Sequence, residues 1–76
     1  MTLGEFIDNN NFNEEEDLFM YNAKSGNGRI EIAVLYGYDY VEIKIDGNTI
    51  LENETIINPF KCKIDSIQKE LFDALN

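Results

Sequence analysis

The chain has 76 residues, which suffices for one small domain and excludes an enzyme with two lobes around a cleft. Hydrophobic residues make up 43% of the chain, so we expect a globular fold rather than a disordered tail. Fifteen acidic residues against six basic ones give a net charge of −9, whose sign is opposite to that of a nucleic-acid-binding protein.

A short helix is predicted at the N-terminus. Thr2 and Glu5 have the spacing of a capping box, and Leu3, Phe6 and Ile7 then share one face. The asparagines at 9–11 end this helix, because their side chains compete for backbone hydrogen bonds. We expect the acidic run at 13–17 to follow as an exposed loop.

A hairpin is predicted next, because the hydrophobic period changes to two. Its first strand is expected at 18–21, its turn at 24–28 and its second strand at 29–36. In the second strand, alternate residues share an inner face, and these are Ile30, Ile32, Val34 and Tyr36.

A third strand is predicted at 40–45, with Val41, Ile43 and Ile45 inside and Tyr40, Glu42 and Lys44 outside. The residues at 46–48 are typical of a tight turn with positive φ, and a short fourth strand is expected at 49–52.

A C-terminal helix is indicated by an apolar stripe with helical spacing. Asn58 followed by Pro59 is one possible start, and the capping-box spacing of Asp65 to Gln68 is another, so both remain open. The sequence therefore predicts one α+β domain over residues 1–76, in the order α-β-β-β-(β)-α. Its antiparallel sheet of three or four strands should have an N-terminal and a C-terminal helix packed on one face. The apolar stripe of the predicted C-terminal helix consists of Phe60, Ile64, Ile67, Leu71 and Ala74.

No catalytic, cofactor or metal site is expected. The chain has no histidine and one cysteine, Cys62, which leaves no base to activate a nucleophile and no ligand set for zinc. The glycines of Gly26-Asn27-Gly28 match neither a phosphate loop nor a dinucleotide fingerprint, so a hairpin turn is favoured there. The acidic residues lie in a predicted loop or alternate outward on strands, where nothing raises a carboxyl pKa for acid–base work. We therefore do not expect an enzyme.

Acidic residues form the first candidate binding surface. Four adjacent carboxylates, and two more on the outer face of the predicted sheet, have two interpretations. They keep a small protein in solution, or they replace nucleic-acid phosphates in a groove lined with lysine and arginine. The residues are Glu14, Glu15, Glu16, Asp17, Glu31 and Glu42.

Tyrosines form the second candidate surface. Tyr36, Tyr38 and Tyr40 are spaced by two residues, and tyrosine is enriched at interface hot spots. Tyr36 is expected in the core, whereas Tyr38 and Tyr40, with Asp39 between them, are expected to contact a partner. Leu35 and Ala33 would extend this surface as a small apolar patch.

The opening Thr2-Leu3-Gly4-Glu5-Phe6-Ile7-Asp8 and the later Leu18-Phe19-Met20-Tyr21-Asn22-Ala23 resemble those of small proteins from bacteriophages and mobile elements. In size, acidity and helix-sheet-helix layout the chain resembles anti-CRISPR proteins, some of which inhibit Cas nucleases by imitating DNA. The resemblance implies a non-enzymatic inhibitor in the cytoplasm of a host bacterial cell. Its partner would be a protein with a basic groove, with no direct nucleic-acid or membrane contact. The local chemistry, rather than any shared motif, nominates the phosphate substitutes of such an inhibitor, and these are Glu14, Glu15, Glu16, Asp17, Glu31, Asp39 and Glu42.

An alternative class of function remains open. A small adaptor or self-associating module would use the tyrosine-rich sheet face, with acidity serving solubility alone. The absence of a leader-like or membrane-spanning apolar run in the sequence is consistent with an intracellular location for either class.

Overall fold

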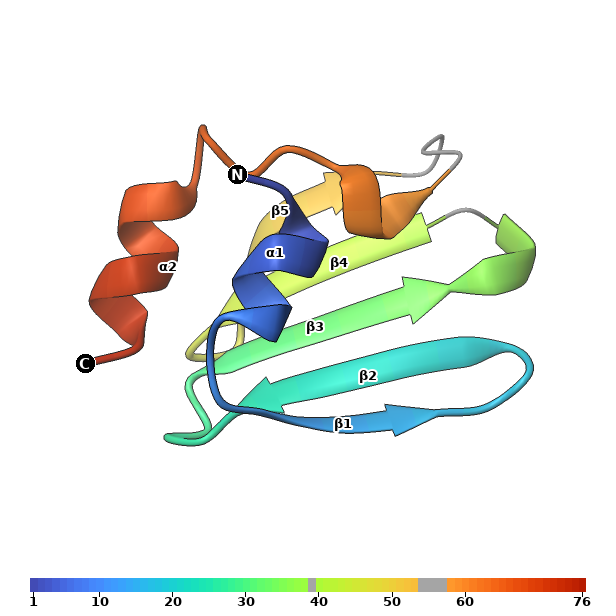
Figure 1. Cartoon of the computed structure of the whole chain (residues 1–76), viewed down its shortest axis with the longest axis horizontal. Helices are drawn as coiled ribbons and strands as arrows, with labels where there is room; N and C mark the ends of the chain where they lie inside the picture. Colours follow the sequence, from blue (N-terminus) through green and yellow to red (C-terminus); the bar gives the residue numbers. More distant parts are fainter. Residues whose placement is uncertain (39, 54–57) are drawn as a thin grey trace.

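A computed structural model of the chain shows one open antiparallel sheet with both helices packed against the same face (Figure 1). The structure describes residues 1–38, 40–53 and 58–76. The described strands are five and lie in the sheet in chain order, so the expected α+β class is confirmed with one strand more than the sequence predicted. They are β1 (Phe12–Glu16), β2 (Met20–Ser25), β3 (Ile30–Leu35), β4 (Tyr40–Ile45) and β5 (Asn48–Asn53), and the α-helices are α1 (Leu3–Asp8) and α2 (Gln68–Ala74).

The additional strand is β1, and the expectation of an acidic loop at 13–17 is wrong. Residues 12–16 pair with β2 from Phe12 opposite Ser25 to Glu16 opposite Tyr21. Phe12 turns toward the helices and packs edge-on against Phe6, with ring centroids 5.6 Å apart. Acidic residues have low strand propensity, but an edge strand tolerates them because water remains close on its outer side.

The first predicted hairpin is shifted along the chain. Strand β2 begins at Met20 rather than Leu18 and continues to Ser25, where a turn had been expected. Leu18 and Phe19 instead connect β1 to β2. The displaced boundary follows from Asp17, whose carboxylate accepts hydrogen bonds from the backbone N–H groups of Phe19 and Met20 and so stabilises a turn.

Strand β4 matches its predicted position and faces, whereas β3 keeps the predicted faces but is one residue shorter at each end, and Tyr36 begins the 3-10 turn η1 (Tyr36–Tyr38). Asp46 at φ 51° and Gly47 at φ 82° form the expected tight turn into β5, which is longer by one residue at each end than predicted. The inner face of the sheet and the helices bury one continuous core. Its members are Leu3, Phe6, Ile7, Tyr21, Ala23, Ile30, Ile32, Val34, Val41, Ile43, Ile64, Leu71 and Ala74.

The N-terminal helix forms as predicted, with both hydrogen bonds of the Thr2–Glu5 capping box present. Its close approach to the chain at Phe60 depends on Gly4, because a Cβ there would lie 3.0 Å from the Phe60 carbonyl oxygen. The backbone N–H of Leu3 also donates to the Cys62 carbonyl at 2.8 Å, which anchors the segment before α2.

Neither predicted start of the C-terminal helix is used. Asn58 does cap a turn, by accepting from the Phe60 N–H, but that turn is a three-residue 3-10 helix, η2 (Pro59–Lys61). Asp65 accepts from the Met1 amino group at 2.8 Å instead of capping a helix. The α-helix therefore begins at Gln68, with Ile67 as an N-cap residue that makes no side-chain bond. The stripe is nevertheless buried at Ile64, Leu71 and Ala74, because Ile64 reaches the core from the segment before α2 and Leu71 and Ala74 reach it from α2 itself.

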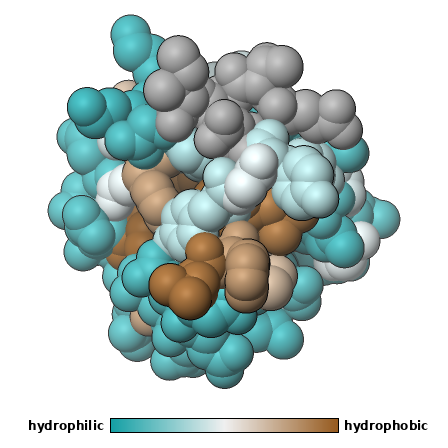
Figure 2. All heavy atoms as spheres, turned by 90° about the vertical axis from the view of Figure 1, so that its right-hand side faces the viewer, coloured by the Kyte–Doolittle hydropathy of each residue, from teal (hydrophilic) through white to brown (hydrophobic). Residues whose placement is uncertain are grey.

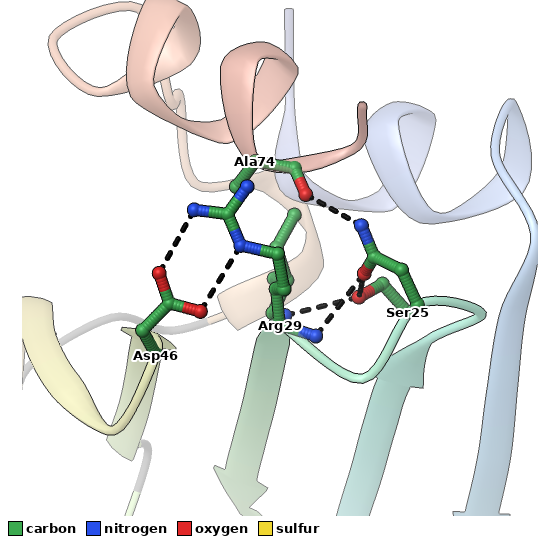
Figure 3. A network of polar contacts seen from close by, with 6 residues as sticks. Ser25, Arg29, Asp46 and Ala74 are labelled. Atoms are coloured by element: carbon green, nitrogen blue, oxygen red, sulfur yellow. Dashed lines mark hydrogen bonds and ion pairs between the residues drawn. The ribbon is translucent and has the colours of Figure 1, made fainter.

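A polar network joins the β2–β3 turn to the end of α2 (Figure 3). Asn27 donates from Nδ2 to the Ala74 carbonyl at 2.7 Å, and its Oδ1 accepts from the Ser25 hydroxyl and the Arg29 N–H. The Arg29 guanidinium makes two hydrogen bonds to the Asp46 carboxylate, at 2.8 and 3.0 Å, and holds the pKa of that carboxyl below its usual value. The Gly26-Asn27-Gly28 segment therefore has a structural role in the hairpin turn, as predicted.

Replacing Asn27 with aspartate is expected to lower the free energy of unfolding by about 1–2 kcal/mol. The carboxylate keeps the two acceptor roles but loses the donor to Ala74, and it places negative charge against the C-terminal carbonyls of α2. Urea denaturation measures the loss. The same chemical change at the exposed Asn48 is the matched control, and an equal loss at both positions would contradict the role assigned to Asn27.

Candidate protein-binding surface

The outer face of the sheet, opposite the helices, carries three rows of side chains that cross the strands. The strand register places Met20, Leu35 and Tyr40 side by side in an apolar row near one end of the sheet. The other two rows are polar. The middle row consists of Glu15, Asn22, Ala33, Glu42 and Glu52, and the far row of Asn13, Lys24, Glu31, Lys44 and Thr49.

The two polar rows surround a shallow open hollow of about 510 Å³. Lys24 lies 3.6 Å from the Glu31 carboxylate and Lys44 lies 3.6 Å from that of Glu42. Two of the carboxylates expected to replace phosphates are therefore paired with lysines of the same face. Exposed pairs of this kind contribute little to stability, but they reduce the negative charge that the face presents.

The acidic run of β1 is divided between the two faces of the sheet. Glu15 lies on the outer face, opposite Asn22. Glu14 and Glu16 lie on the helix side, where they accept hydrogen bonds from the hydroxyls of Tyr21 and Tyr36. The four adjacent carboxylates at 14–17 thus do not form one surface.

Asp17 has a separate structural role. Its Oδ1 accepts from the N–H groups of Phe19 and Met20 at 2.7 and 2.9 Å, and its own N–H donates to the Met20 carbonyl at 2.9 Å. The two bonds that the carboxylate accepts lower the pKa of the Asp17 carboxyl, the bond from Phe19 contributing most. They also make Leu18 and Phe19 the two central residues of a tight hairpin turn.

Leu18 and Phe19 are 87% and 76% exposed, and Tyr38 is 78% exposed. They are the three most exposed large hydrophobic residues of the described part of the chain. Tyr38 belongs to the 3-10 turn η1 (Tyr36–Tyr38), and the Tyr36 N–H donates to the Phe19 carbonyl at 2.9 Å, which ties the two turns together. Figure 2 shows hydrophobic atoms gathered on this end of the molecule, with hydrophilic residues around them.

We call this surface the apolar patch and define it by the two turns and the adjoining apolar row. Leu18, Phe19 and Tyr38 are its exposed members, and Met20, Leu35 and Tyr40 are half-buried at its base. Of the tyrosines predicted to contact a partner, Tyr38 and Tyr40 both lie in it, whereas Asp39 lies outside the described residues. Tyr36 packs against the core, as expected.

Leu18 and Phe19 were not predicted as binding residues, because their hydrophobic pattern was read as the start of a strand. One signal for them was present in the sequence. An aspartate such as Asp17, immediately before two residues that would otherwise begin a strand, is typical of a turn that the aspartate side chain stabilises. Apolar residues are uncommon at the centre of such turns, which makes Leu18 and Phe19 notable there.

Three tyrosine hydroxyls that lie beside carboxylates have a raised pKa. Burial, followed by the Glu16 carboxylate, raises the pKa of Tyr36 to about 12. Burial, followed by the carboxylates of Glu52 and Glu42, raises the pKa of Tyr40 to about 12. Burial and the bond to Glu14 raise the pKa of Tyr21 as well.

We therefore expect folding stability to fall as the pH rises from about 10 to about 12. A tyrosine in the unfolded chain loses its proton near pH 10, whereas these tyrosines keep theirs when folded, so alkali favours the unfolded state. Below about pH 10 this contribution to stability is complete. Urea midpoints at several alkaline pH values measure the decrease, and Tyr36→Phe should show a smaller one. A decrease unchanged by that substitution would contradict the assignment of Tyr36.

A cluster of metal-ligating side chains and a membrane-spanning helix are both absent from the described ranges. Residues 1–38, 40–53 and 58–76 contain no group of three or more side chains placed to hold a metal ion. None of the helices in those ranges combines the length and the apolar character that crossing a membrane requires. Comparison of the chain with protein-family models, with curated proteins and with solved structures finds no significant match.

Proposed function

We propose that the protein is a binding module whose apolar patch docks into a pocket on a protein partner. The observation that carries this proposal is the exposure of Leu18 and Phe19 at the centre of a tight turn. Turns of this kind favour glycine, asparagine and aspartate, and folding gains little from a leucine and a phenylalanine that remain in water. Exposed hydrophobic groups gathered in one place mark interaction sites.

The charges beside the patch indicate the chemistry of the partner. Asp17 precedes the two exposed residues, Glu16 lies against Tyr36, and Glu42 accepts from the Tyr40 hydroxyl at 3.3 Å. The chain as a whole carries a charge of −9. A partner with lysine or arginine around an apolar pocket would match both parts of this surface and would be attracted over a distance.

A second candidate is an inhibitor of a nucleic-acid-handling protein, with carboxylates occupying its basic groove. The middle row of the outer face supports this candidate, because Glu15 and Glu52 lie outside ion-pair distance of every described lysine and arginine. The two lysines on the same face weigh against it, as does the turning of Glu14 and Glu16 to the helix side. We rank it below docking through the apolar patch.

Affinity capture from a bacterial lysate with three immobilised forms tests the proposal. The wild type is compared with Leu18→Ser/Phe19→Ser, which removes the exposed part of the patch. The third form is Glu15→Gln/Glu42→Gln/Glu52→Gln, which removes three carboxylates from the outer face. We expect a protein that is retained by the wild type and the glutamine form and lost from the serine form. Retention by the serine form and loss from the glutamine form would favour the second candidate.

A further inference from the structure

Strand β1 forms one edge of the sheet and, within the described residues, pairs with β2 alone. The Asn11 carbonyl accepts from Gly26 and the Asp17 N–H donates to Met20, so both of these residues direct backbone groups toward β2. Because antiparallel strands alternate in this respect, the backbone groups of Asn13 and Glu15 also face β2. Those of Phe12, Glu14 and Glu16 therefore point outward.

This edge has the regular geometry that an added strand requires. Five consecutive residues of β1 pair with β2 without a bulge, whereas β4 and β5 at the opposite edge shift register after Ile43. The edge strand contains no proline and no lysine, two residues that commonly protect such edges. Residues 13–16 are all exposed.

The carboxylates of β1 favour an added strand that carries positive charge. Glu14, Glu15 and Glu16 all lie outside ion-pair distance of the described lysines and arginines. The hydroxyls of Tyr21 and Tyr36 hold two of these carboxylates in place on the helix side of the edge. A second copy of the strand would set glutamates against glutamates, so pairing between copies is opposed.

We propose that the free edge of β1 binds an extended basic segment of a partner protein by strand addition. The segment hydrogen-bonds to the outward backbone groups of Phe12, Glu14 and Glu16, about 4.8 Å from β1. Its side chains alternate between the two faces, with lysine or arginine beside the glutamates. This inference does not depend on the apolar patch and concerns a second interaction surface.

A synthetic peptide of seven residues, alternating lysine and valine with blocked ends, is the probe. Amide hydrogen exchange measured by NMR gives the direct readout. In the free protein the amides of Asn13 and Glu15 should exchange slowly and those of Phe12, Glu14 and Glu16 rapidly. With peptide bound, the second group should become slow as well. A peptide of the same sequence methylated at every backbone nitrogen keeps the charge and removes every backbone N–H donor, so its binding should fall about tenfold or more.

Two substitutions at one position separate charge from backbone pairing. Glu14→Gln keeps the outward N–H and should weaken peptide binding about two- to fivefold at low salt. Glu14→Pro has the same charge as Glu14→Gln but lacks that N–H. An edge strand accepts proline where the N–H faces water, so the fold should persist while peptide binding is lost. Circular dichroism checks the fold of both variants, and Leu18→Ser/Phe19→Ser should bind the peptide as the wild type does.

The inference is overturned if the methylated peptide binds as tightly as the unmodified one, which would reduce the interaction to charge attraction. It is also overturned if the peptide does not bind, or if it leaves the exchange of the Phe12, Glu14 and Glu16 amides unchanged. These readouts stand even if Glu14→Pro fails to fold, because the peptide comparison uses the wild-type protein.

Discussion

Replacing Phe6 with alanine is expected to lower the free energy of unfolding by about 3–5 kcal/mol. The Phe6 side chain is fully buried in α1 and packs edge-on against Phe12 of β1 and Phe72 of α2, with ring centroids 5.6 and 5.4 Å away. Its removal leaves a cavity where the N-terminal helix, the edge strand and the C-terminal helix meet. A domain of this length has a total stability of roughly 4–11 kcal/mol, so this single substitution removes a large part of it.

Phe72→Ala is the matched control. Phe72 makes one of the same ring contacts but is 37% exposed, so its loss should cost only about 1 kcal/mol. Urea denaturation followed by circular dichroism compares the two. A loss at Phe6 no larger than that at Phe72 would contradict the packing of α1 between the two elements.

Leu18→Ser/Phe19→Ser is expected to reduce affinity for the captured partner about thirtyfold or more. Truncating one anchoring side chain at an interface costs about 2 kcal/mol or more, so a single anchor among these two residues already gives this loss. Stability should change by less than about 0.5 kcal/mol, because both side chains lie mostly in water. Isothermal titration calorimetry and urea denaturation give the two values. A large loss of stability with affinity retained would assign these residues to folding rather than binding.

Much of the fold was predictable from short-range patterns. The alternation along β3 and β4 shows which residues are buried, and Asp46-Gly47 has the chemistry of its turn, since both residues have positive φ. The Thr2–Glu5 capping box likewise depends only on neighbouring residues. The residues that determine each of these elements lie within a few positions of one another in the chain.

The remaining elements depend on contacts between distant residues. Strand β1 forms because β2 offers a free edge and because Phe6 lies where Phe12 can pack against it, which no local pattern of acidic residues indicates. The expected helix around Ile64 is interrupted because the chain there hydrogen-bonds to Met1 and Leu3. The candidate surface shows the same division. Tyr38 and Tyr40 were candidates from their spacing alone, whereas Leu18 and Phe19 were expected in a strand and lie instead in a turn that the Asp17 carboxylate stabilises.

The measurement that most directly tests docking through the apolar patch is the affinity of two variants for the captured partner at low and at high salt. Leu18→Ser/Phe19→Ser changes no charge, and Glu15→Gln/Glu42→Gln/Glu52→Gln replaces no apolar side chain. We predict that the serine variant binds weakly at both salt concentrations, and that the glutamine variant loses at most about tenfold, mainly at low salt where charges are least screened. Wild-type affinity in the serine variant, together with loss of binding in the glutamine variant at low salt, would contradict docking through the apolar patch.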